Sequence, residues 1–125
     1  MEKRNKKILL AEDDSVIGPM YETKLTQDGF SVVLAVDGAT ALEALNKEKF
    51  DLVLLDIIMP QLDGFSVLEE IRSNSKIKNM PVIMLTNLGT DEDIEKGKKM
   101  GVIDYLVKSS LTPTEVSLRV KKYFK

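Results

Sequence analysis

Side chains able to bind a cation or transfer a group follow several of the short apolar runs of this 125-residue sequence. If these runs are strands of one parallel sheet, their carboxyl ends meet at one edge, which is where open α/β sheets bind ligands. The side chains would then share one crevice. In chain order they are Glu12, Asp13, Asp14, Asp56, Thr86 and Lys108.

The sequence contains no Cys and no His, so thiolate nucleophiles, imidazole bases and zinc sites built from these residues are excluded. Converging carboxylates repel one another unless a cation lies between them. Oxygen ligands without His or Cys favour a hard divalent ion such as Mg2+. With Mg2+ and Lys108 present, the crevice suits a phosphoryl group, and Asp56 is a candidate nucleophile toward phosphorus.

Five β-rich apolar runs are expected to be the strands that position these residues. Several are apolar at consecutive positions, which is typical of strands buried on both faces of a parallel sheet. Each gap is long enough for a crossover helix, so the fold class is α/β with a doubly wound (βα)5 arrangement. The expected strands are residues 8–11, 31–36, 52–55, 81–85 and 104–107.

The last helix has the clearest start signal. Thr112, Pro113 and Glu115 form a capping box with Pro at the first helical position, and Val116, Val120 and Tyr123 are expected to form its apolar stripe. An earlier helix is expected to begin after a Thr90 cap and to end at Gly101.

The first helix, over residues 15–28, has the weakest pattern. Gly18 and Pro19 interrupt it, and a proline inside a helix costs about 3 kcal/mol, so we expect a kink or an irregular first turn there. Asp14 is expected to cap this helix rather than to bind metal.

Charge and composition narrow the class of partner. The net charge is −2, so no basic field points to nucleic acid or to an anionic membrane, and small or protein partners remain. Only four apolar residues precede the acidic cluster at Glu12, which is too short for a signal peptide, and no apolar run approaches the roughly 20 residues of a membrane span. We expect one cytoplasmic domain over residues 1–125.

Four sequence motifs together carry a family resemblance. They are ILLAEDDS, LVLLDIIMPQLDGF, VIMLT and DYLVK. In these motifs the sequence resembles the receiver domain of two-component response regulators, and the likeness extends from Lys7 to Phe124. The resemblance implies a flavodoxin-like sheet with strand order 2-1-3-4-5, as in single-domain receivers of the chemotaxis type.

The resemblance also implies roles for the crevice residues. Asp56 would accept a phosphoryl group from a sensor histidine kinase or a phosphotransfer protein. Asp13 would bind Mg2+ directly, Glu12 through water, and Ile58 through its backbone carbonyl. Lys108 would contact the phosphoryl group.

By the same resemblance, the protein would be a two-state switch and not an enzyme that turns over a separate substrate. Thr86 would move toward the phosphoryl oxygens, and Tyr105 would swing inward behind it. A new dianion can bias such a loop by creating charge-assisted contacts. The changed surface would comprise the fourth helix, fifth strand and fifth helix, and it would bind a downstream protein.

Some residues depart from the family pattern. Asn87 stands where a smaller residue usually follows the threonine, and Ser109 stands where proline usually follows the lysine. Without that proline we expect a trans Lys108–Ser109 bond, since a cis bond would cost about 2.5 to 4 kcal/mol. By the same resemblance, Ile58 and Leu88 would flank the path of a hydrolytic water; neither side chain can orient that water, so a long-lived phosphorylated form is expected.

Three alternatives remain open at this stage. A haloacid-dehalogenase-like phosphatase normally needs a second aspartate two residues after the first, where this chain has Ile58. A flavin module would favour a Ser/Thr/Gly-rich phosphate loop where this chain has EDDSVIGP. A pseudo-receiver would bind partners without phosphorylation. Mg2+ binding with uptake of a phosphoryl group would separate a true receiver from a pseudo-receiver.

Overall fold

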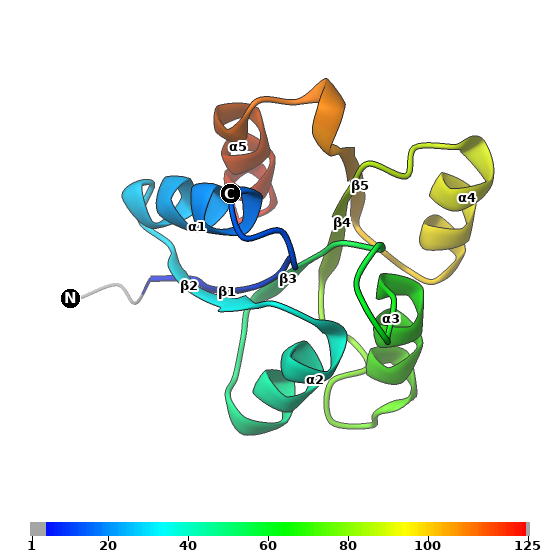
Figure 1. The fold of residues 1–125 in the computed structure, drawn as a ribbon. Helices are drawn as coiled ribbons and strands as arrows, with labels where there is room; N and C mark the ends of the chain where they lie inside the picture. Colours follow the sequence, from blue (N-terminus) through cyan, green and yellow to red (C-terminus); the bar gives the residue numbers. More distant parts are fainter. Residues whose placement is uncertain (1–4, 125) are drawn as a thin grey trace.

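Five parallel strands in the order β2-β1-β3-β4-β5 form the centre of the computed structural model, which describes residues 5–124 (Figure 1). The sheet has the predicted strand order. The elements are β1 (Lys7–Ala11), α1 (Ile17–Gln27), β2 (Ser31–Ala35), α2 (Gly38–Lys47), β3 (Leu52–Leu55), α3 (Gly64–Ser73), β4 (Val82–Thr86), α4 (Asp91–Lys99), β5 (Asp104–Val107), the 3-10 turn η1 (Lys108–Ser110) and α5 (Pro113–Tyr123).

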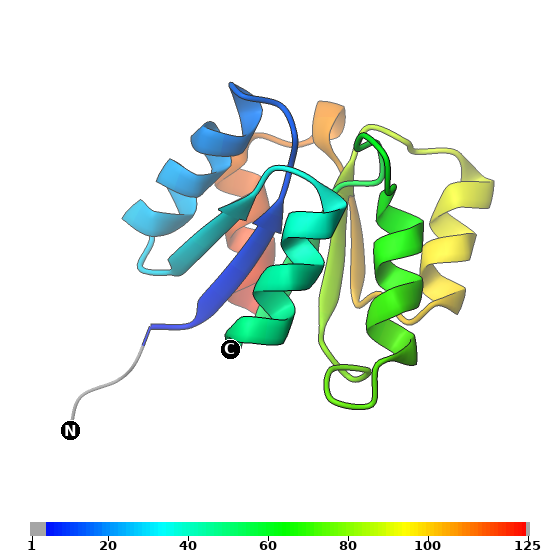
Figure 2. The same ribbon diagram turned by 60° about the horizontal axis from the view of Figure 1, so that its bottom comes forward.

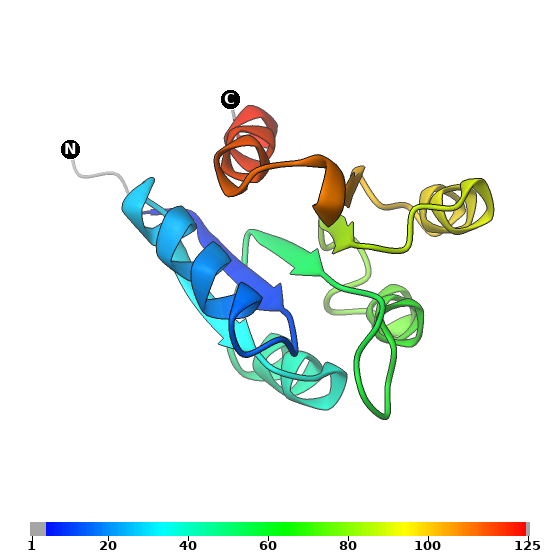
Figure 3. The same ribbon diagram turned by 45° about the horizontal axis from the view of Figure 1, so that its top comes forward.

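The helices cover both faces of the sheet. Helices α1 and α5 lie on one face, and α2, α3 and α4 lie on the other (Figures 1 and 3). Alternate residues of β1 follow this division: Ile8 packs in the cluster beneath α1 and α5, and Leu9 packs in the cluster beneath α2 and α3. Because successive side chains of a strand point to opposite faces, a strand covered on both sides is apolar throughout.

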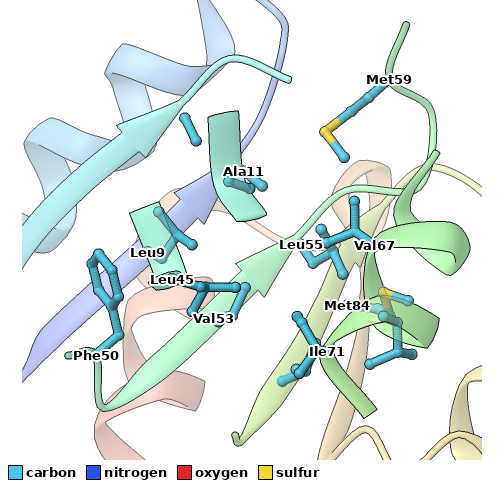
Figure 4. Packing of buried hydrophobic residues seen from close by; sticks show 14 of the residues in the cluster. Leu9, Ala11, Leu45, Phe50, Val53, Leu55, Met59, Val67, Ile71 and Met84 are labelled. Atoms are coloured by element: carbon cyan, nitrogen blue, oxygen red, sulfur yellow. The ribbon is translucent and has the colours of Figure 1, made fainter. Parts of the chain in front are cut away.

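The core beneath α2 and α3 fills the space between those helices and the sheet (Figure 4). Leu55 of β3 points toward Val67 of α3, Val53 lies beside Leu45 of α2, and Met59 lies at the end nearest the loops (Figure 4). All five side chains are buried. This packing fixes β3, and therefore the residue that follows it, relative to its neighbours.

Helix α5 begins as predicted. The Thr112 hydroxyl accepts a hydrogen bond from the Glu115 amide (3.1 Å), and the Glu115 carboxylate accepts one from the Thr112 amide (2.8 Å). The expected stripe is wrong at its end, because Tyr123 is 42% exposed. Phe124, just past the helix, takes the inward place against Phe30, with ring centroids 6.0 Å apart.

Helix α1 starts later than predicted, at Ile17 instead of residue 15, and the expected interruption falls in its first turn. Pro19 is the third helical residue, where the backbone N–H would have no partner within the helix, so proline costs little there. One carboxylate oxygen of Asp14 accepts hydrogen bonds from the Val16 and Ile17 amides at 2.8 and 2.9 Å. Asp14 thus satisfies two amides at the start of α1, as a cap would, although the residue at the N-cap position is Val16, which makes no side-chain capping bond.

The loops that follow β1, β3, β4 and β5 lie along one edge of the sheet, the upper edge in Figure 2. All five strands run in the same direction, so each contributes its last residue to this edge. Strand β4 includes Thr86, one residue beyond the predicted end, and β2 ends one residue early at Ala35.

At the opposite edge, Arg72 of α3 holds two loops together. Its guanidinium donates hydrogen bonds to the carbonyls of Lys78 (3.0 Å) and Met80 (2.8 Å), before β4. It also donates to the carbonyls of Met100 (2.9 Å) and Gly101 (3.0 Å), after α4. The planar group with its fixed fork of donors is suited to this arrangement.

Replacing Arg72 should destabilise the fold. Arg72→Ala removes all four hydrogen bonds from a charged donor, and we expect a loss of about 2–4 kcal/mol in the free energy of unfolding. Arg72→Lys should lose most of the same amount because an ammonium cannot reproduce the fork. Urea unfolding measures the change. Arg119→Ala is the control, since its exposed ion pair with Asp104 should contribute at most about 1 kcal/mol.

Candidate functional site

Backbone pairing places two acids at the loop edge of the sheet. The amide of Glu12, just past β1, donates to the carbonyl of Ala35 (2.9 Å), and the amide of Asp56, just past β3, donates to the carbonyl of Ala11 (3.1 Å). These bonds continue the strand ladders by one residue. Both acids are buried, with exposed fractions of 2% for Glu12 and 5% for Asp56.

Lys108, which follows the edge strand β5, forms ion pairs with both acids. Its Nζ lies 2.8 Å from Oδ2 of Asp56 and also pairs with Oε1 of Glu12. The lysine is the first residue after β5, and its side chain is only 9% exposed. A buried carboxylate is costly without a partner, so this ammonium compensates both acids.

The pKa values of the buried groups reflect this arrangement. Burial raises the pKa of Glu12, and hydrogen bonds from Lys108 and from the Asp14 amide offset only part of that effect. Burial by itself would lower the pKa of Lys108, but its hydrogen bonds to Asp56 and Glu12 outweigh burial and raise it. Lys108 is therefore charged at neutral pH.

Three carboxylates meet at this edge. Oxygen atoms of Glu12, Asp13 and Asp56 all lie within 4.8 Å of one another, and Asp13 is exposed to solvent. One ammonium leaves this group with excess negative charge, and the donors are all oxygen. Such a set fits Mg2+, which takes oxygen ligands and keeps several waters.

Asp56 also accepts hydrogen bonds from its own loop. Its Oδ1 accepts from the Ile57 amide at 2.7 Å and more weakly from the Ile58 amide at 3.4 Å. The Ile58 side chain is 58% exposed, so it does not fill the site. The loop thus fixes the orientation of the Asp56 carboxylate.

Two glycines allow helices to approach the acids. A Cβ at Gly64, the first residue of α3, would lie 2.1 Å from the carbonyl oxygen of Asp56, which no side chain could occupy. A Cβ at Gly18 would lie 3.3 Å from Cγ of Glu12. The unusual Gly18 in the first helix therefore leaves room for the buried acid beside it.

Thr86 and Tyr105 are connected through the loop after β4. The Leu88 amide donates to the Thr86 hydroxyl at 3.3 Å, and the Tyr105 hydroxyl donates to the Leu88 carbonyl. Thr86 is fully buried, and the Tyr105 ring lies against the backbone of Gly97 in α4. Burial raises the pKa of Tyr105 to about 12, so the phenol keeps its proton.

Sequence reasoning missed one contact at this edge. Oδ1 of Asn87 accepts a hydrogen bond from the Ser109 amide at 3.0 Å. The available signal is that both positions depart from the family pattern: Ser109, in place of proline, supplies an N–H, and Asn87 supplies an acceptor. Among residues 5–124 no peptide bond is cis, so the Lys108–Ser109 bond is trans, as predicted.

Comparison with known proteins agrees with this geometry. The family described as "Response regulator receiver domain" matches residues 8–121, and the chain belongs to this family. The receiver domain of the Francisella response regulator 1452 superposes with a TM-score of 0.87 at 36% identity, covering 97% of this chain and all of that one. Chemotaxis protein CheY4 of Vibrio cholerae gives 0.88 at 30% identity, covering 95% of this chain and 98% of that one.

Longer relatives share the same region. A "Probable transcriptional regulator ycf27" of Galdieria sulphuraria is 43% identical over 119 residues, which is 95% of this chain and 45% of that protein. The chain spans about half the length of the curated relatives that it matches.

Family membership sets the class of function. The chain is a receiver of two-component signalling, a class that works as a signalling component and not by turnover of a substrate, and that generally binds Mg2+ at its acidic pocket. A receiver implies a histidine kinase and a downstream effector. Within residues 5–124, no helix combines the length and apolar character that a membrane crossing requires. The cytoplasmic location stays a prediction.

Metal binding should depend on pH through Glu12. Because burial raises the pKa of this acid above its usual value near 4.5, protons should compete with Mg2+ at a higher pH than for an exposed glutamate. Affinity should therefore fall as the pH is lowered through that raised pKa, and Glu12→Gln should move the fall to lower pH. Calorimetric Mg2+ titration from pH 4.5 to 8 measures both.

The same titration ranks the acids. Asp13→Ala should abolish Mg2+ binding more completely than Glu12→Gln, because Asp13 is expected to bind the ion directly and Glu12 through water. An affinity unchanged in Asp13→Ala would contradict this assignment.

Proposed function

We propose that the protein is a phosphorylation-dependent switch whose Asp56 accepts a phosphoryl group with Mg2+ bound by Glu12, Asp13, Asp56 and the Ile58 carbonyl. The observation that carries the proposal is the position of Asp56: buried, with Oδ2 2.8 Å from Lys108 and with two further carboxylates beside it. This group combines an oxygen nucleophile with the charges that phosphoryl transfer requires.

The proposed reaction is a direct transfer. An oxygen of Asp56 forms a bond to phosphorus while the bond from phosphorus to the donor breaks, and the donor nitrogen or oxygen keeps the electron pair. A nitrogen donor then takes a proton from solvent. Lys108 stabilises the phosphoryl oxygens, and Mg2+ when bound offsets their negative charge. No general base is needed, because Asp56 reacts as a carboxylate.

The conformational change would pass from Thr86 to Tyr105 through the backbone of Leu88. Thr86 and Tyr105 both hydrogen-bond to the backbone of this residue, one at its amide and the other at its carbonyl. If the Thr86 hydroxyl turns toward the phosphoryl oxygens, its bond from Leu88 is released and the support for Tyr105 changes. We propose that the altered surface comprises α4, β5 and α5.

The partners follow from this scheme. The donor would be the phosphohistidine of a sensor kinase or of a phosphotransfer protein, and the effector would be a protein that docks on the changed surface. The net charge of −2 supports protein docking by this region instead of direct DNA binding. The relatives named as transcriptional regulators suggest that gene expression is the eventual output. We extend the single-domain assignment to residues 1–125, of which 1–4 and 125 lie outside the described part.

Incubation with acetyl phosphate or phosphoramidate should add one phosphoryl group, and only when Mg2+ is present. Without the cation, an anionic donor would meet an anionic pocket. Intact-mass analysis measures uptake, with a chelated sample as the second arm.

Asp56→Asn is the control and should take up no phosphoryl group. Uptake that persists in this variant, or that ignores chelation, would overturn the assignment. An unmodified protein that still binds Mg2+ would favour the alternative, a pseudo-receiver that docks without phosphorylation.

The phosphorylated form should be long-lived. Ile58 and Leu88 carry no group able to orient a water molecule, and such assistance is worth about 100-fold or more where it exists. Ile58→Asn should therefore speed the loss of phosphate, measured on purified phosphoprotein without a phosphatase. Val36→Asn is the matched control, because Val36 is 55% exposed and follows β2 on the same edge. Equal lifetimes in both variants would show that the lack of a water-orienting group at position 58 does not limit hydrolysis.

A further inference from the structure

The end of β5 has little support beyond the strand ladder. In the strand order β5 is an edge strand, so it pairs on one side only, with β4. The last paired residues of that ladder are Thr86 and Val107. Lys108, the next residue, therefore lies just outside the sheet, and yet its Nζ must reach two buried carboxylates.

The turn that follows leaves an unpaired donor. Residues Lys108–Ser110 form the short 3-10 turn η1, whose N-cap Val107 makes no side-chain capping bond. The first N–H groups of any helical turn lack acceptors within the turn. A proline after Lys108 would have no N–H to satisfy, but Ser109 does.

Asn87 supplies the missing acceptor from the neighbouring loop. It follows Thr86, and its Oδ1 accepts from the Ser109 amide at 3.0 Å. The hydrogen bond extends the connection between β4 and β5 past the end of their ladder, and it caps η1 from outside. It joins the residue after the buried hydroxyl to the residue after the buried lysine.

We propose that Asn87 is a positioning residue for Lys108. By accepting the hydrogen bond from Ser109, Asn87 holds the backbone of Lys108 at the sheet edge, so that Nζ stays directed at Asp56. This inference rests on the proposed function, since the benefit of a fixed Lys108 is faster phosphoryl transfer to Asp56. Asn87 acts through Ser109 and needs no contact with the phosphoryl group.

Asn87→Ala should slow phosphorylation by phosphoramidate about two- to tenfold at saturating Mg2+, the range expected for one hydrogen bond. The Ser109 amide should exchange with solvent faster by a similar factor, as measured by NMR. Mg2+ affinity and the midpoint of urea unfolding should stay within error, because neither the metal ligands nor the core changes. A merely structural role would move the unfolding midpoint instead.

Two further variants make the test specific. Asn87→Asp keeps an acceptor oxygen at the same reach and should keep both the Ser109 protection and most of the rate. Asn79→Ala removes an exposed asparagine from the loop before β4, at the opposite edge, and should change neither quantity.

The outcomes separate this inference from the proposed function. An unmutated protein that takes up no phosphoryl group would overturn both. Normal phosphorylation of the unmutated protein with an equal rate in Asn87→Ala would overturn only the positioning role. The positioning role alone would also be overturned if Asn87→Asp keeps the Ser109 amide protected from exchange and yet is phosphorylated as slowly as Asn87→Ala.

Discussion

Two carboxylates buried at one edge of a sheet must share a cation, and much of this structure serves that requirement. Glu12 and Asp56 follow adjacent strands and are almost fully covered. Lys108 meets both, although its strand lies two positions away from β3 in the sheet. Since an unpaired buried charge costs several kcal/mol, the path of the chain after β5 is constrained by the acids that follow β1 and β3.

The same constraint explains how the surrounding loops are built. Helices must begin close to the acids to bury them, which accounts for glycine at positions 18 and 64, where a side chain would meet Glu12 or the Asp56 backbone. The loop after β4 is tied by hydrogen bonds at both Asn87 and Leu88. A site held from several loops can respond as a unit when the charge at its centre changes, which is what a phosphorylation switch requires.

Many features could be predicted from short stretches of sequence. The consecutive apolar residues of β3 indicate a strand buried on both faces, and Thr112 with Glu115 specifies the start of α5 through bonds that span three residues. The convergence of Glu12, Asp56 and Lys108 followed from one rule about parallel sheets. The prediction that Tyr123 belongs to the buried stripe of α5 was wrong, because helical periodicity does not indicate where a helix leaves its neighbours. Phe124 packs against Phe30 in its place.

What local sequence signals could not supply is the set of contacts between distant segments. Arg72 reaches carbonyls that lie up to 29 residues away, and Asn87 meets the Ser109 amide 22 residues further along the chain. Composition, periodicity and capping describe interactions within a few residues. These signals indicated the helices and strands and the chemically active residues that follow the strands. The pairing of one loop with another depends on how the packed helices and strands bring their ends together, so it was settled only when the tertiary structure formed.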